Sequence, residues 1–77
     1  MQITIYTKSN CPACVSAKQL LKSKSMTFTE IDADNETVRE WFARDYPEVR
    51  QMPQIFINGQ RVGGLAGLQA ALKQVGI

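Results

Sequence analysis

Polar and apolar residues alternate at the start of the chain and then change to a helical period. Two isoleucines separated by a threonine lie within residues 2–7, and this β-rich run predicts a strand. From Pro12 to about Lys24 the apolar residues gather on one side of a helix, with polar residues mostly on the other. The apolar side consists of Cys14, Ala17, Leu20 and Leu21. The chain therefore opens with a strand followed by an amphipathic helix.

The middle of the chain repeats this order. Residues 28–32 predict a second strand. Asp34 or Asn35 can cap a helix behind it, and this helix ends at Tyr46-Pro47. Its apolar stripe consists of Val38, Trp41 and Phe42. We expect the stripe to lie under the sheet and residues 45–50 to form a solvated loop.

A hairpin and a last helix complete the pattern. Asn58-Gly59 is a strong two-residue turn sequence between the short apolar run 55–57 and its partner 60–62. The final segment has apolar residues at helical spacing, namely Leu68, Ala71, Leu72 and Val75. The order of the predicted elements is βαβαββα.

This order predicts an α/β fold. A strand–helix–strand unit in so short a chain implies a parallel pair joined by a right-handed crossover, and the hairpin adds antiparallel strands. We expect a four-stranded mixed sheet flanked by three helices that cover both faces, in a single domain over residues 1–77.

Length and composition exclude several classes of function. The chain has 77 residues and a net charge of +2, which is too weak a signal for nucleic-acid binding, and it lacks a targeting or membrane-spanning pattern. We therefore expect a cytoplasmic monomer that binds neither nucleic acid nor membranes. With two cysteines and no histidine, a histidine-assisted cysteine hydrolase and a metal site made by one chain are both disfavoured.

The main chemical signal is Cys11-Pro12-Ala13-Cys14 at the head of the first predicted helix. A helix N-terminus lowers the pKa of a thiol through free N–H groups and the positive end of its dipole, and proline fits the first helical position. Three residues along a helix also bring two cysteines within reach of a disulfide. At the first strand-to-helix turn of a βαβ unit, the pair is thioredoxin-like and indicates thiol–disulfide exchange. We expect Cys11 to be partly exposed and Cys14 to be buried.

The chain resembles the glutaredoxins over nearly its whole length. The resemblance rests on the cysteine motif, Met52-Pro53-Gln54-Ile55-Phe56, Asn58-Gly59 and Gly63-Gly64, in that order and at the family's separations. It implies a thioredoxin-like fold and a glutathione-dependent oxidoreductase that reduces protein disulfides and glutathione mixed disulfides, with glutathione as electron donor and no bound cofactor. It also implies that Cys11 is the catalytic nucleophile, that Cys14 is the resolving thiol, and that Pro53 is cis.

The resemblance further implies a glutathione groove beside the cysteines. Its implied residues are Lys8, Arg50, Gln51, Met52, Pro53, Gly64, Leu65 and Ala66. Lys8, with Arg50 or Gln51, would hold the glycine carboxylate, and the backbone of Met52 would pair with the cysteinyl residue. The head of the last helix would hold the other carboxylate.

Two departures from the family pattern leave alternatives open. Residues 65–67 contain no carboxylate to hold the ammonium of glutathione, and Ala13 stands where an aromatic residue is usual. The missing carboxylate favours a redoxin that is reduced by thioredoxin reductase and donates electrons to ribonucleotide reductase. The alternative of another class is a non-catalytic binding module or a carrier of an iron–sulfur cluster, which the stiff Pro12 disfavours.

Overall fold

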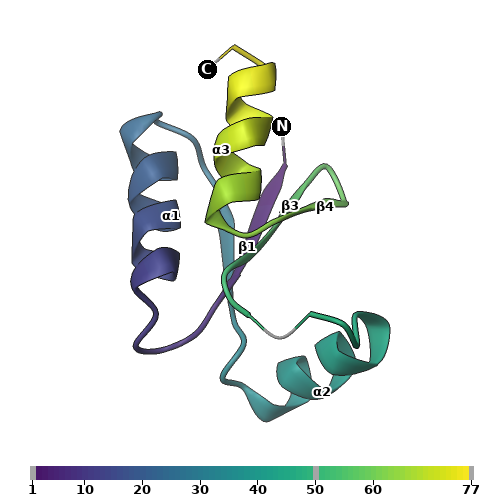
Figure 1. Ribbon diagram of the computed structural model, residues 1–77. Coiled ribbons are helices and arrows are strands. Elements are labelled where there is room, and N and C mark those ends of the chain that lie inside the picture. The colour runs from purple at the N-terminus through teal and green to yellow at the C-terminus, as the bar shows by residue number, and fades with distance from the viewer. Residues whose placement is uncertain (1, 50, 77) are drawn as a thin grey trace.

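The computed structural model describes residues 2–49 and 51–76 and has the predicted order of elements. The elements are β1 (Ile3–Thr7), α1 (Pro12–Ser23), β2 (Thr29–Asp32), α2 (Glu36–Asp45), β3 (Gln54–Ile57), β4 (Gln60–Gly63) and α3 (Leu65–Gln74). The four strands form one mixed sheet and the three helices flank it, which confirms the predicted fold class (Figure 1).

The sheet has the strand order β2-β1-β3-β4. β1 runs parallel to β2 and antiparallel to β3, and β3 forms a hairpin with β4. Asn58 and Gly59 both have positive φ, 52° and 84°, as a type I′ hairpin turn requires. The two central strands therefore carry the buried residues, and the edge strand β2 is mostly exposed.

The larger core lies between the sheet and the pair α1 and α3, which stand side by side in Figure 1. It contains Ile3, Ile5, Ala17, Leu21, Ile55, Leu68 and Leu72. The period of two along β1 and β3 places these strand residues on one face, and the helical period places Ala17 and Leu21 opposite them. Aliphatic burial on this face fixes both helices against the sheet.

An aromatic cluster occupies the opposite face, under α2. The Tyr6 ring lies 5.1 Å from Phe42, 5.6 Å from Phe56 and 5.8 Å from Trp41, measured between ring centroids. Tilted and edge-on rings at such distances attract one another beyond their buried area. Burial also raises the pKa of the Tyr6 phenol, with a further contribution from Tyr46. Tyr6 is therefore a core residue.

Two sequence predictions about exposure were wrong. The segment after α2 is not a simple solvated loop, because Tyr46 and Val49 pack against the aromatic cluster. Val75 was expected on the buried side of the last helix, but it is the C-cap of α3 and 56% exposed. The helix ends before its last apolar position could reach the sheet. None of the helices within residues 2–49 and 51–76 has the length and apolarity needed to cross a membrane.

α3 and the hairpin approach each other closely at Gly67. A Cβ atom built there would lie 1.8 Å from the Val62 carbonyl oxygen. Gly67→Ala should therefore force α3 away from β4 and lower the free energy of unfolding by about 3 kcal/mol. Gly64→Ala is the matched control, because its Cβ would meet Pro53 O at an ordinary 3.4 Å. This control should lose about 1 kcal/mol through its weaker capping, and equal losses in urea titrations would contradict the prediction.

Candidate active site: a disulfide at the head of the first helix

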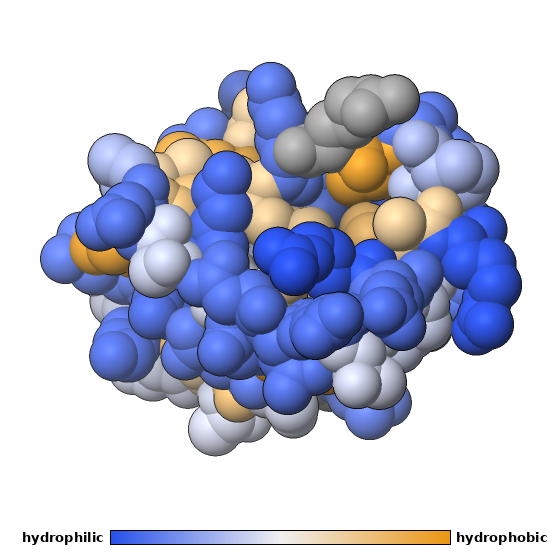
Figure 2. Space-filling model, turned by 90° about the horizontal axis from the view of Figure 1, so that it is seen from below, coloured by the Kyte–Doolittle hydropathy of each residue, from blue (hydrophilic) through white to orange (hydrophobic). Residues whose placement is uncertain are grey.

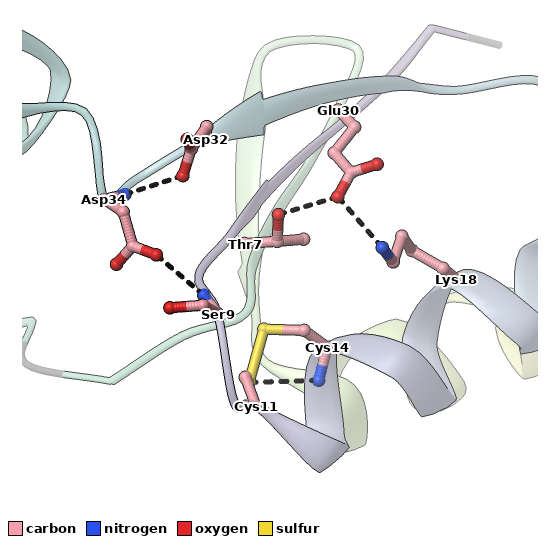
Figure 3. Close-up of polar contacts among 8 residues, drawn as sticks. All are labelled: Thr7, Ser9, Cys11, Cys14, Lys18, Glu30, Asp32 and Asp34. Carbon is pink, nitrogen blue, oxygen red and sulfur yellow. Dashed lines mark hydrogen bonds and ion pairs between the residues drawn. A yellow bond between two sulfur atoms is a disulfide. The ribbon is translucent and has the colours of Figure 1, made fainter.

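Cys11 and Cys14 form a disulfide at the start of α1, with their Cα atoms 5.2 Å apart (Figure 3). Cys11 is the N-cap with an extended backbone, and Pro12 occupies the first helical position. Proline loses nothing there, since the first helical N–H has no partner within the helix. The motif therefore has the placement that the sequence predicted.

The local field at Cys11 favours negative charge on sulfur. The Cys14 N–H, one of the free donors of the first turn, points at Cys11 Sγ from 3.1 Å. The first turn of α1 has no acidic residue that would offset the positive end of the helix dipole. When the disulfide is reduced, the same donor and dipole stabilise a thiolate at Cys11 more than a thiol.

Burial of the two sulfurs differs less than expected. Cys14 is 2% exposed, as predicted, but Cys11 is only 7% exposed. The carbonyl oxygen of Met52 lies 3.4 Å from Cys11 Sγ and covers it from the side of β3. A disulfide sulfur carries no hydrogen, so this is a close contact between the two loops. The prediction of a partly exposed Cys11 is therefore wrong for the oxidised form.

The segment before β3 meets the cysteines through the sheet register. Tyr6 in β1 is opposite Gln54 in β3, so β1 ends and β3 begins at the same end of the sheet. The Met52-Pro53 bond is cis, as the resemblance implied. A Cβ atom added to Gly64, at the head of α3, would lie 3.4 Å from the Pro53 carbonyl oxygen, so the end of the hairpin lies in the same region.

Lys8 and Met52 line a hollow of about 430 Å³ between the cysteine loop and α2. Arg39 lines it too, and the sequence had not indicated this residue. The available signal was topological: α2 begins directly after the parallel strand β2, whose end lies beside the end of β1. Arg50 lies outside the described residues. Gln51 and the α3 residues Leu65 and Ala66 do not line this hollow.

A second hollow, of about 590 Å³, lies on the other side of Lys8 and borders the disulfide. Its lining includes both cysteines, Pro12, Lys18 and Val15, which is 49% exposed. Figure 2 looks onto the lower end of the molecule, where apolar surface is framed by strongly polar side chains. The disulfide is thus flanked by apolar surface and by two lysines.

A polar network behind the disulfide holds the loop before it (Figure 3). The Ser9 N–H donates to Asp34 over 2.8 Å, and this bond lowers the pKa of the Asp34 carboxyl. Lys18 and the Thr7 hydroxyl donate to Glu30 over 3.0 and 2.8 Å, and the bond from Lys18 is the larger cause of the lowered pKa of Glu30. Glu30 in β2 and Asp34 just after it therefore hold Thr7 and Ser9, the two neighbours of Lys8 in the chain.

A disulfide between two cysteines three residues apart, at the first strand-to-helix turn of this sheet, is typical of a thiol–disulfide oxidoreductase of thioredoxin-like fold. The glutaredoxin family model matches residues 3–62. A probable glutaredoxin from Synechocystis is 46% identical over 71 residues, which cover 90% of this chain and 80% of the relative. Glutaredoxin 3 of Escherichia coli is 38% identical over 68 residues, covering 88% and 82%.

Structural comparison agrees with the sequence comparison. Glutaredoxin 1 from Francisella tularensis, solved in complex with cacodylate, superposes with a TM-score of 0.80 at 30% identity and covers 96% of this chain and 94% of that one. The chain belongs to the glutaredoxin family. It is a thiol–disulfide oxidoreductase with a dithiol motif.

The Glu30 network predicts a specific pH dependence of stability. A carboxyl with a lowered pKa in the folded state stabilises fully above its unfolded value, here 4.5, and loses that contribution as the pH falls through the folded value. In Glu30→Gln the free energy of unfolding should therefore fall less steeply as the pH drops below about 4.5. At neutral pH the same variant should have a free energy of unfolding about 0.2–1 kcal/mol lower than the wild type.

Urea titrations between roughly pH 3 and pH 7 test this prediction. Glu40→Gln, at an exposed position of α2, is the matched control and should keep the wild-type slope. An unchanged acid slope in Glu30→Gln would show that the network contributes no pH-dependent stability.

Proposed function

We propose that this glutaredoxin reduces protein disulfides and glutathione mixed disulfides with electrons from glutathione. The observation that carries the proposal is the Cys14 N–H aimed at Cys11 Sγ, with the Met52 carbonyl against the same sulfur. The first contact favours a thiolate at Cys11, and the second puts the backbone just before β3 beside the reacting atom. A reactive thiolate and a backbone segment next to it suit attack on a disulfide held by a peptide.

In the proposed reaction the Cys11 thiolate attacks one sulfur of the substrate disulfide. A mixed disulfide forms, and the other substrate sulfur leaves as a thiolate that takes a proton from solvent. For a protein disulfide substrate, Cys14 then loses its proton and attacks Cys11 Sγ, and the second substrate sulfur leaves as a thiolate that takes up a proton, so the substrate becomes a dithiol and the Cys11–Cys14 disulfide remains. Two glutathione molecules restore the dithiol: the first forms a mixed disulfide with Cys11, and the second leaves with it as glutathione disulfide.

The charges around the first hollow support a glutathione carboxylate there. Lys8 and Arg39 both line it, and they provide two cations within one concave site. The carboxylate of Asp34 lies in the same lining and accepts the Ser9 N–H, so it partly offsets these cations. We therefore assign the glycine carboxylate to Lys8 and Arg39, with Met52 offering its backbone to the cysteinyl residue.

The head of α3 would hold the γ-glutamyl end. Gly64 caps this helix without a side-chain bond, and free N–H groups of the first turn suit a carboxylate. The first turn has no acidic residue, so the ammonium of glutathione lacks an ionic partner there. This feature favours the second candidate function, a redoxin fed by thioredoxin reductase that donates to ribonucleotide reductase. The cytoplasmic location, the monomeric state and the single-domain extent stay predictions.

The roles of the two cysteines predict different losses. Cys11→Ser should abolish reduction of every disulfide, because no nucleophile remains. Cys14→Ser should lose reduction of protein disulfides but keep removal of glutathione from mixed disulfides, a step that needs one thiol. Coupled NADPH oxidation with glutathione reductase measures both reactions. Deglutathionylation by Cys11→Ser would show that the roles are assigned wrongly.

Ala66→Asp separates the two candidate electron donors. A carboxylate at the exposed position 66 should bond the glutathione ammonium and lower the apparent KM for glutathione about 3- to 30-fold, equal to about 0.7–2 kcal/mol. Ala70→Asp, one turn later on the same helix, is the matched control and should leave this KM unchanged. No gain with glutathione, together with rapid reduction by thioredoxin reductase, would favour the redoxin.

A further inference from the structure

Gln54 is a buried polar residue whose side chain bonds the loop before β3. It is the first residue of β3 and is 7% exposed. Its Nε2 donates to the Gln51 carbonyl over 2.9 Å, and its Oε1 accepts from the Arg61 guanidinium over 3.3 Å. A buried amide keeps its orientation only when both ends are satisfied, and here both are.

The bond to Gln51 fixes the direction of the next N–H. The carbonyl of Gln51 and the N–H of Met52 belong to one planar peptide unit, and the only cis bond among the described residues is Met52-Pro53. In a trans unit the two groups point in opposite directions. Holding the Gln51 carbonyl against Gln54 therefore turns the Met52 N–H away from β3. Within residues 2–49 and 51–76 no acceptor takes this N–H.

Arg61 determines which end of the Gln54 amide faces Gln51. Its guanidinium carries only donors, so it accepts no bond and selects the oxygen of Gln54. The same guanidinium lies 5.6 Å from the centre of the Tyr46 ring and 3.9 Å from a Glu48 oxygen. Contacts to the chain after α2 thus hold Arg61, and Arg61 in turn orients the Gln54 amide.

We infer that Gln54 is a positioning residue that presents the Met52 N–H to the main-chain carbonyl of an extended thiol substrate. The inference rests on the proposed function, in which Met52 pairs with the cysteinyl residue of the substrate. Recognition of the substrate carbonyl then depends on the Gln54 side chain, which does not touch the substrate. The contribution is specific to substrates with a carbonyl next to the reacting cysteine.

A chemical cycle of two substrates and two proteins tests this role. One substrate is the mixed disulfide of glutathione with 2-mercaptoethanol, and the other is cystamine, the disulfide of cysteamine, which has no carbonyl. Gln54→Met should lower kcat/KM about tenfold for the glutathione substrate, mainly through KM, and less than about twofold for cystamine. The pKa of the Cys11 thiol, measured by alkylation rate, should not change.

Two further variants keep the test independent of folding. Gln54→Glu retains the size of the side chain and the contact with Arg61 but replaces the donor by an acceptor, so it should lose at least as much as Gln54→Met. Gln60→Met, at an exposed position of β4, is the matched control and should match the wild type with both substrates.

The possible outcomes separate the inference from the proposed function. Equal losses on both substrates, or an altered Cys11 pKa, would make Gln54 a structural residue only and would overturn the inference. Wild-type kinetics in both Gln54 variants would overturn it as well. If the wild type fails to turn over either substrate with glutathione but accepts electrons from thioredoxin reductase, the proposed function fails instead.

Discussion

The pairing of β1 with β3 is the constraint on which the site depends. Because the strands are antiparallel, the last residues of β1 lie beside the first residues of β3, with Tyr6 opposite Gln54. The cysteine loop follows β1 and the Met52-Pro53 segment precedes β3, so both lie at this end of the sheet. This arrangement explains why Cys11 Sγ meets the Met52 carbonyl. Since side chains alternate along a strand, a register slip of one residue would exchange the faces of β3 and bring Ile55 to the aromatic cluster and Phe56 to the aliphatic core.

Charge around the disulfide is arranged so that the positive groups nearest the first helix are only partly neutralised. Glu30 pairs with Lys18 and lies behind the loop, whereas Asp34 bonds the Ser9 backbone. Lys8 and Arg39 line the hollow beside Met52. An incoming anionic thiol therefore meets cations on the side of α2 and the helix dipole at Cys11, and both favour the thiolate form of the attacking or leaving sulfur.

The sequence predicted most of the architecture because the periods change clearly from strand to helix. The position of the cysteine pair at the head of α1 was predicted correctly because proline is favoured at the first position of a helix. Long-range placement could not be read in the same way. Arg39 reaches the hollow because α2 starts at the end of the sheet where β1 ends. Tyr46 and Val49 pack against the aromatic cluster, which lies on the α2 face of the sheet.

Burial of Cys11 was mispredicted for a related reason: its cover comes from Met52, 41 residues away along the chain. The Cys11–Cys14 bond closes a loop within one helical turn, so it removes little conformational entropy from the unfolded chain. The two separate cores, neither of which uses the disulfide as a cross-link, supply the stability. Redox chemistry is thereby confined to the helix head and the Met52 loop, and the sheet that aligns them can stay the same in both states.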